Sequence, residues 1–139
     1  MYIIYFIMGT YTLVLKNNKE FKKKIGSLGK ILFKKGYYTY TGSVPENNFS
    51  RTERHRNICN GEKDTEHWHI DYILQSPTIS IIDIFKTNKD KECEINNDIK
   101  FTEFNTIGAS DCTNCESHVK YSDNLKQLAV NLKCVYKDN

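Results

Sequence analysis

The first third of the chain consists almost entirely of short strand-forming runs separated by turn signals, which limits the folds it can adopt. Residues 3–15 and 37–41 are rich in Ile, Tyr, Phe, Thr and Val, the residue types that favour strands. Shorter runs of the same kind cover 21–25 and 31–33, and glycines and an Asn-Asn pair supply the turns. The sequence therefore predicts a β-rich first third.

Helical patterns follow in the second part of the chain and alternate with one further strand. Ser50 stands where a helix N-cap would, with Glu53 as its capping-box partner, which predicts a helix over about residues 51–58. Further helices are predicted at 66–74, 91–99 and 122–136, a central strand at 78–87, and irregular chain at 101–121. This order predicts an α+β fold in which helices flank a small, mostly antiparallel central sheet.

Length and composition describe one folded domain. The 139 residues suffice for one hydrophobic core and are too few for two, so a single domain over 1–139 is expected. The apolar opening, residues 1–8, lacks a basic leader and is far too short to span a bilayer, so we expect a buried strand and no membrane contact. Five cysteines, an odd number, argue against a disulfide framework and predict a cytoplasmic protein.

The charge of the chain is small but unevenly distributed. A net charge of +3 does not by itself indicate a nucleic-acid partner. Lysines gather between residues 16 and 35 and arginines between 51 and 56, so the first half is basic. One interpretation is an ordinary solvated lysine-rich face. The other is a surface that grips phosphates through Lys22, Lys23, Lys34, Lys35 and Arg54.

Two glycine-tyrosine elements lie on the predicted strands, Gly9-Thr10-Tyr11 and Tyr40-Thr41-Gly42. The helix predicted after them carries Arg51 and His55, which are four residues apart and therefore share one helix face. A cation and a titratable imidazole thus lie near the strand that carries Tyr40. Taken singly, such tyrosines are usually packing residues; their order along the chain is what indicates a site.

In this order the residues resemble the signature of the GIY-YIG nuclease superfamily. There, two such tripeptides on neighbouring strands precede a helix arginine, often a histidine, and a metal-binding glutamate. The chain is similar to the Uri-type branch from about residue 8 to 121, through His67-Trp68-His69-Ile70-Asp71-Tyr72, Glu92-Cys93-Glu94, Gly108-Ala109-Ser110-Asp111-Cys112 and Ser117-His118. Thr10 and Thr41 stand in place of the superfamily's isoleucines, and its late polar residue has no assigned counterpart. The long span between the two tyrosines implies an added β-ribbon over about residues 16–36.

The resemblance implies a metal-dependent DNA endonuclease. Tyr11 would help to take a proton from the attacking water, Arg51 and Tyr40 would contact phosphate oxygens, and Glu92 would hold one Mg²⁺ or Mn²⁺ ion. His55 and His67 are candidates for proton transfer or phosphate contact, because imidazole titrates near neutral pH. A tyrosine base is demanding: its ordinary pKa near 10 leaves about a thousandth ionised at pH 7 unless cations lower it.

Two metal questions stay open on the sequence. Glu94 competes with Glu92 for the catalytic ion, and since the two point apart on a helix, only one should face the site. The Cys112-x2-Cys115-x2-His118 spacing lets three ligands reach one tetrahedral ion. The resemblance suggests Cys93 as the fourth ligand of a structural Zn²⁺; the other candidates are Cys59, Cys134 and His69. Free cysteines beside a surface histidine are the alternative.

The leading interpretation is an endonuclease that cuts DNA with little or no sequence specificity in repair or defence. RNA is a second substrate class to consider, and a DNA-repair protein is an expected partner. The alternative is a noncatalytic nucleic-acid-binding or adaptor module on the same scaffold. A zinc-stabilised protein-interaction domain is a third reading.

Overall fold

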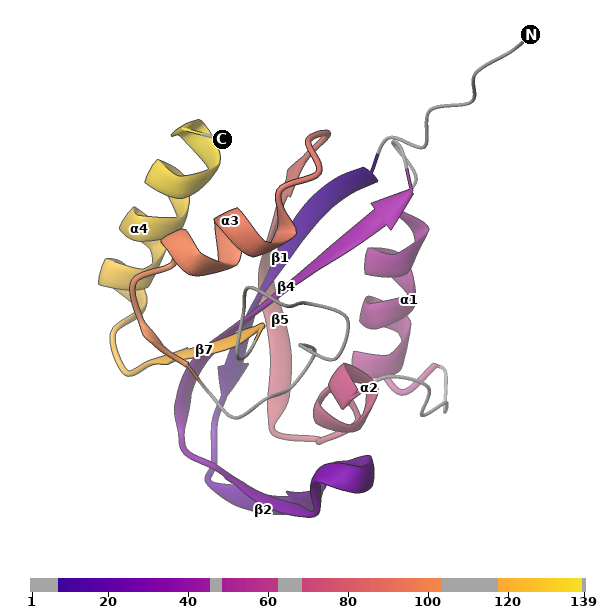
Figure 1. Cartoon of the computed structure of the whole chain (residues 1–139). Helices are drawn as coiled ribbons and strands as arrows, with labels where there is room; N and C mark the ends of the chain where they lie inside the picture. Colours follow the sequence, from indigo (N-terminus) through magenta and orange to yellow (C-terminus); the bar gives the residue numbers. More distant parts are fainter. Residues whose placement is uncertain (1–7, 46–48, 63–68, 104–117, 139) are drawn as a thin grey trace, which may run out of the picture.

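The computed structural model describes residues 8–45, 49–62, 69–103 and 118–138. Its main sheet has five antiparallel strands in the order β5-β1-β4-β7-β6. These strands are β1 (Met8–Asn17), β4 (Gly36–Pro45), β5 (Ile79–Thr87), β6 (Thr102–Glu103) and β7 (Val119–Ser122). Helices cover both faces of the sheet (Figure 1). The predicted α+β fold, with an antiparallel sheet flanked by helices, is confirmed.

The alternation of side chains along β1 gives the sheet two different cores. Tyr11, Leu13 and Leu15 are buried on one face and belong to the larger hydrophobic cluster, whereas Val14 belongs to a second cluster. This is the period of two expected for a strand, in which successive side chains point to opposite faces. Both faces of β1 are therefore buried, as suits a strand paired on both sides.

Two helices cover the first face. They are α1 (Ser50–Cys59) and α2 (His69–Leu74), which bury Ile58, Ile70, Ile73 and Leu74 against the larger cluster. The second face is covered by α3 (Glu92–Asp98) and α4 (Leu125–Asp138), which bury Ile95, Leu128, Leu132 and Val135 in the second cluster. Figure 1 shows the pairs on opposite sides of the sheet.

A separate two-stranded ribbon, β2 (Phe21–Lys24) and β3 (Lys30–Phe33), is inserted between β1 and β4. A short 3-10 turn, η1 (Gly26–Leu28), joins its strands. Phe21 and Phe33 stack at its base, with ring centroids 4.9 Å apart, and contribute to the larger cluster. The added ribbon predicted between the two tyrosine elements is confirmed.

Three local predictions were wrong. Ser50 is the first residue of α1 and not its N-cap; Phe49 holds that position and makes no side-chain capping bond, so the predicted capping box with Ser50 as N-cap does not form. The strand predicted as central is β5, which pairs only with β1 and lies at the edge of the sheet. Part of the segment predicted to be irregular forms β6 and β7. Tertiary pairing decides an edge position or a short strand, and local residue patterns do not record it.

Within the described residues, no helix is long and apolar enough to cross a membrane.

The packing of α4 on the sheet can be tested with two truncations on one helix. Leu128 is 1% exposed, whereas Val130, two residues later, is 58% exposed. Leu128→Ala should lower the free energy of unfolding by about 3 kcal/mol because it opens a cavity in the second cluster. Val130→Ala should change it by less than about 0.5 kcal/mol. Denaturant unfolding of both variants measures the difference, and equal effects would contradict the described packing of α4.

Candidate active site

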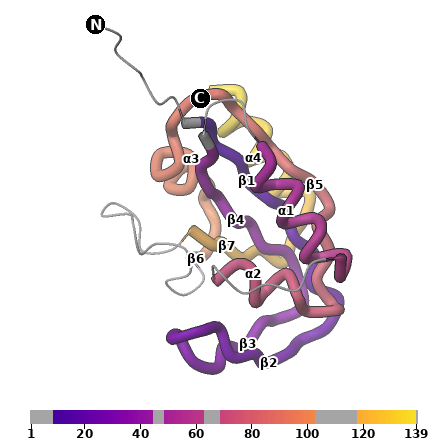
Figure 2. The backbone as a smooth tube through the Cα atoms, turned by 90° about the vertical axis from the view of Figure 1, so that its right-hand side faces the viewer, coloured from indigo at the N-terminus to yellow at the C-terminus, as the bar shows by residue number. Residues whose placement is uncertain are grey.

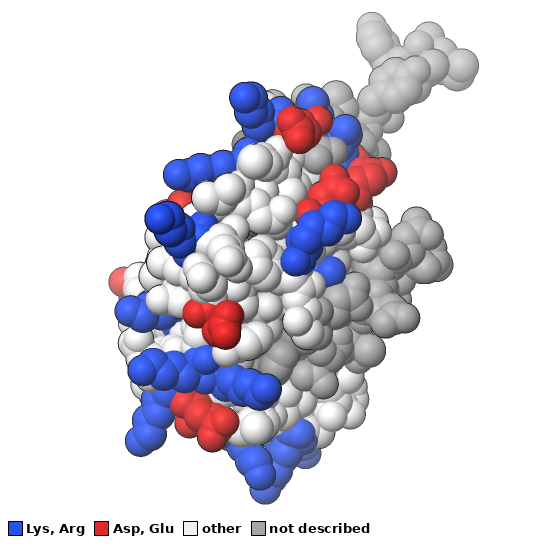
Figure 3. Space-filling view, turned by 90° about the vertical axis from the view of Figure 1, so that its left-hand side faces the viewer, with Lys and Arg blue, Asp and Glu red and all other residues white. Residues whose placement is uncertain are grey.

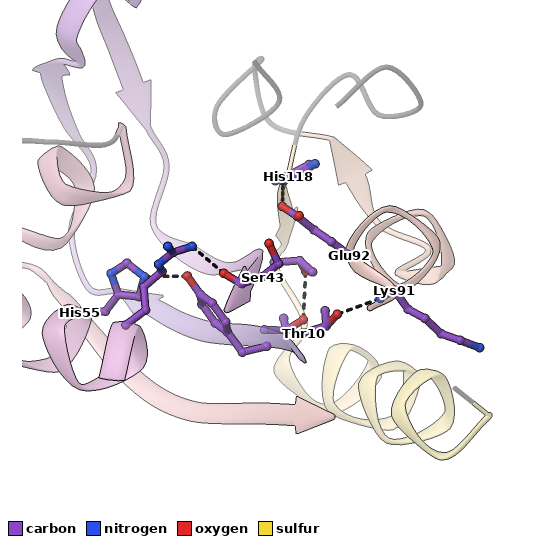
Figure 4. A network of polar contacts seen from close by, with 10 residues as sticks. Thr10, Ser43, His55, Lys91, Glu92 and His118 are labelled. Atoms are coloured by element: carbon purple, nitrogen blue, oxygen red, sulfur yellow. Dashed lines mark hydrogen bonds and ion pairs between the residues drawn. The ribbon is translucent and has the colours of Figure 1, made fainter. Parts of the chain in front are cut away.

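Three aromatic rings meet where β1, β4 and α1 come together. Tyr11 on β1 and Tyr40 on β4 have ring centroids 6.3 Å apart, and the ring of His55, on α1, lies 5.6 Å from the first and 6.0 Å from the second. The Tyr11 hydroxyl is 2.8 Å from His55 Nε2, a hydrogen-bond distance. Tyr11 and His55 are buried, and Figure 4 shows His55 at the left end of the polar network.

Gly42 makes room for the Tyr11 ring. The strand register places Gly42 directly opposite Tyr11. A Cβ atom at Gly42 would lie 2.7 Å from the Tyr11 hydroxyl oxygen and 2.8 Å from the ring, closer than real Cβ contacts allow. Any larger residue would therefore push the ring away from its present position. The glycine of Tyr40-Thr41-Gly42 is therefore required because a larger residue would clash with the Tyr11 ring.

Arg51 is fixed beside these hydroxyls by the end of β4. Its Nη1 atom donates a 2.6 Å hydrogen bond to the carbonyl oxygen of Ser43. The guanidinium is close enough to lower the pKa of both Tyr11 and Tyr40. One turn of helix and the strand end beside it therefore place a fixed positive charge at the paired phenols.

Burial dominates the protonation of the three rings. It raises the pKa of Tyr11 far above its usual value, and Tyr40 and Glu92 raise it further, while Arg51 and Arg54 only partly oppose this. The pKa of Tyr40 is raised by burial and then by Glu92. Burial also lowers the pKa of His55 to about 4. At neutral pH the site thus holds two protonated phenols and one neutral imidazole.

Glu92 and His118 approach the same site from the other side. Glu92, in the first turn of α3, is 28% exposed, and its Oε1 atom lies 2.8 Å from Nδ1 of His118. Figure 4 shows the two side chains pointing toward one another. Glu94, on the same helix, is exposed and Glu92 is the one that acts on the pKa of both tyrosines. Of the two rival carboxylates, Glu92 is therefore the one at the site.

The segment that carries Glu92 is held by a residue whose role the sequence did not reveal. Thr10 is fully buried, and its hydroxyl donates a 2.7 Å hydrogen bond to the carbonyl oxygen of Lys89. The hydroxyl oxygen of Thr10 also accepts a 2.9 Å hydrogen bond from the backbone N–H of Lys91, the residue before Glu92. An isoleucine at this position could make neither bond. The signal in the sequence that could have indicated this role is a polar β-branched residue on a strand predicted to be buried.

A family model described as "Domain of unknown function DUF123" matches residues 10–139, nearly the whole chain. The chain belongs to this family. It has no significant match among curated proteins or among solved structures. Tyr11, Tyr40, Arg51, His55, Glu92 and His118 all lie within the DUF123 match.

The DUF123 domain uses Arg54 differently from the predicted phosphate contact. Both end nitrogens of Arg54 donate to the carboxylate of Asp71 on α2, each at 2.8 Å. Asp71 is fully buried, so this bidentate pair holds α1 against α2 and neutralises a buried carboxylate. Arg54 therefore contributes to the structure behind the site, and the sequence pattern of α1 alone does not show this.

The predicted lysine contacts also divide into two groups. Lys22, Lys34 and Lys35 are exposed, whereas the Lys23 amine donates a 2.6 Å hydrogen bond to the Tyr72 carbonyl oxygen. Lys24 and Lys30 face each other across the ribbon and are exposed as well. Figure 3 shows basic side chains gathered at the lower end of the DUF123 domain, where the ribbon lies in Figure 1, with acidic side chains between them.

The zinc ligands predicted for the DUF123 domain are not brought together in the part of the chain that the structure describes. Cys112, Cys115 and the catalytic candidate His67 lie outside it. Cys93 is disulfide-bonded, contrary to the expectation of reduced cysteines, and in that state offers no thiolate to a zinc ion. Cys59 and Cys134 are free. The described residues contain no group of three or more His, Cys, Asp or Glu side chains placed to hold a metal.

The buried neutral His55 predicts a pH-dependent stability. His55 takes up a proton near pH 6.5 in the unfolded chain but only near pH 4 in the folded chain. Between these two pH values, unfolding is therefore accompanied by the binding of a proton. Stability contributed by His55 is fully present above pH 6.5 and is lost as the pH falls toward 4, by about 3 kcal/mol. Unfolding free energies of wild type and His55→Gln across this range give the difference. His69→Gln, on the partly exposed ring of α2, is the control, and an identical pH slope in wild type and His55→Gln would contradict the assignment.

Proposed function

We propose that this DUF123 domain is a metal-dependent DNA endonuclease whose site is of the GIY-YIG, Uri-type kind. The observation that supports this most is that Arg51 on α1 and Glu92 on α3 both act on the pKa of Tyr11 on β1 and of Tyr40 on β4. Hydrolysis of a phosphodiester needs an acceptor for the water proton, positive charge at the phosphate and help for the leaving oxygen. These residue types can supply all three. We place its action in the cytoplasm, in DNA repair or defence.

The proton of the attacking water would pass through Tyr11 to His55. Because burial raises the pKa of Tyr11, a standing phenolate is not available as a base. The neutral His55 ring, with its proton on Nδ1, can accept the Tyr11 proton at Nε2 across 2.8 Å while Tyr11 receives one from water. Burial, Arg54 and Arg51 act against the imidazolium that forms, and the carboxylate of Asp71 partly offsets them, since it acts to raise the pKa of His55. Tyr11 is therefore a relay and His55 the final acceptor.

Arg51 and Tyr40 are suited to binding the phosphate. Tyr40 stays protonated at neutral pH because its pKa is raised, so its hydroxyl is a permanent hydrogen-bond donor. Arg51, anchored on the Ser43 carbonyl, adds a positive charge that needs no reorganisation during the reaction.

Glu92 is the residue that would hold a divalent cation. Its carboxylate is partly exposed at the site, and Mg²⁺ or Mn²⁺ is commonly held by one or two protein oxygen ligands while keeping several waters. Such a cation, when bound, supplies charge stabilisation for the leaving oxygen. The Glu92 side chain thus fits the cation that the resemblance implies.

The ribbon is the proposed grip on the DNA backbone. Figure 2 shows α3 and the β2–β3 ribbon projecting to the same side of β4, on the left in that view. A duplex lying along this side could contact the exposed ribbon lysines and the site together. Phosphate contacts of this kind carry no sequence information, which agrees with weak specificity.

The noncatalytic alternative draws support from the same protonation states. Two phenols that stay protonated and one anchored guanidinium can bind a phosphate without acting as bases. This alternative predicts DNA binding with no turnover.

A plasmid-nicking assay tests the endonuclease. Wild type should nick supercoiled DNA with Mg²⁺ or Mn²⁺ and not in EDTA, and Arg51→Ala or Glu92→Ala should each lower the rate by about 100-fold or more. Arg56→Ala and Glu94→Ala, exposed positions on the same two helices, are the matched controls. Full nicking by either site variant would defeat the site assignment. Gel-shift binding in EDTA without nicking under any condition would favour the noncatalytic module.

The salt dependence of DNA binding tests the ribbon. Replacing Lys22, Lys24 and Lys30 together by alanine should reduce the slope of log affinity against log salt by about 2 to 3 units, because each phosphate contact contributes about 0.9. The matched control replaces three exposed lysines of α4, Lys126, Lys133 and Lys137. If the α4 variant loses as much slope as the ribbon variant, the basic ribbon is not the DNA-binding surface.

A further inference from the structure

His118 is a buried side chain whose two ring nitrogens have no hydrogen-bond partner in the described part of the chain. The residue is 2% exposed, and among the residues that the structure describes neither Nδ1 nor Nε2 has a hydrogen-bond partner. Nδ1 does lie 2.8 Å from Glu92 Oε1, within ion-pair distance, but the contact does not meet the angle that an N–H hydrogen bond needs. Hydrogen bonds weaken steeply when misaligned, so this contact satisfies neither group well. Buried polar atoms without partners are costly and call for a ligand.

The separation of the two atoms matches that of two ligands of one metal ion. Adjacent ligands of an octahedral ion, with bonds of about 2.1 Å, lie about 3 Å apart. Ligands of a tetrahedral zinc ion with similar bonds lie about 3.4 Å apart. The observed 2.8 Å between Nδ1 and Oε1 is closer to the octahedral value. A lone pair on Nδ1 facing a carboxylate oxygen is repulsive without a cation between them.

The main sheet fixes the backbone beside both residues, His118 and Glu92. The carbonyl of His118 accepts a 3.1 Å hydrogen bond from the backbone N–H of Thr41 on β4, which fixes the start of β7. Thr10 on β1 holds the residues just before Glu92. The backbone at His118 and the backbone just before Glu92 are therefore positioned by two adjacent strands, as a metal site requires.

We propose that His118 is a second protein ligand of the cation held by Glu92. Imidazole is a good ligand for first-row transition ions and a poor one for Mg²⁺, whereas carboxylate oxygen accepts Mg²⁺ and Mn²⁺ alike. The mixed pair therefore selects an octahedral transition cation, with Mn²⁺ as the probe, over Mg²⁺. This inference rests on the proposed function for the use of the ion, but the binding itself is measured without DNA.

The test is calorimetric titration of the whole chain with MnCl₂ and, separately, with MgCl₂. Wild type should bind Mn²⁺ at least about tenfold more tightly than Mg²⁺. His118→Ala should weaken Mn²⁺ binding by about tenfold or more and leave Mg²⁺ binding almost unchanged, and Glu92→Gln should weaken both. The matched controls are His69→Ala on α2 and Glu94→Gln on α3, which should bind both ions as wild type does.

Circular dichroism and thermal unfolding show whether each variant is folded. If His118→Ala does not fold, His118→Gln replaces it, and its side-chain oxygen should remove the preference for Mn²⁺ while keeping Mg²⁺ binding. Wild-type Mn²⁺ affinity in a folded His118 variant, or no preference for Mn²⁺ in wild type, overturns the inference. If wild type nicks DNA while one of these results is obtained, the His118 ligand is rejected and the proposed endonuclease function is retained. Loss of Mn²⁺ binding in both site variants without any nicking would support the cation site and reject the endonuclease.

Discussion

The register between β1 and β4 is the constraint on which the site depends. It places Tyr11 opposite Gly42, the only residue type that leaves space for the ring, and so directs the phenol toward His55. On the opposite face of β1, the same register directs Thr10 toward the loop before α3. A shift of one residue would exchange the faces of β1 and remove both contacts at once. One strand thus sets the position of the aromatic cluster and of the carboxylate.

The electrostatics of the site follow from how deeply it is buried. Burial keeps both phenols protonated and His55 neutral, so the charges at the site come from Arg51 and Glu92. Behind them the bidentate Arg54–Asp71 pair neutralises a carboxylate that would otherwise be buried alone. At neutral pH such a site offers two phenolic hydrogen-bond donors and one fixed positive charge beside a carboxylate.

The predicted residues divide according to how they depend on the rest of the fold. Arg51 and Glu92, from two different helices, both act on the pKa of Tyr11 and of Tyr40. His118 was considered with the cysteine cluster, yet it lies against Glu92 and links what were two separate metal hypotheses. The charge of Arg54 and Lys23 predicted contacts with phosphate groups. In the structure Arg54 binds the Asp71 carboxylate and Lys23 binds the Tyr72 carbonyl oxygen.

The sequence by itself determined the strands of the first third, the inserted ribbon, the α+β class and the helices of the second part. These depend on residue type and on periods of two and 3.6, which are local properties of the chain. Only the tertiary structure decided that β5 is an edge strand, that Glu92 and not Glu94 faces the site, and that His118 meets it. Tyr11 and His55 are 44 residues apart in the chain, and no local pattern records a contact over such a separation. It forms only when the sheet register and the helices packed on both faces bring the side chains together.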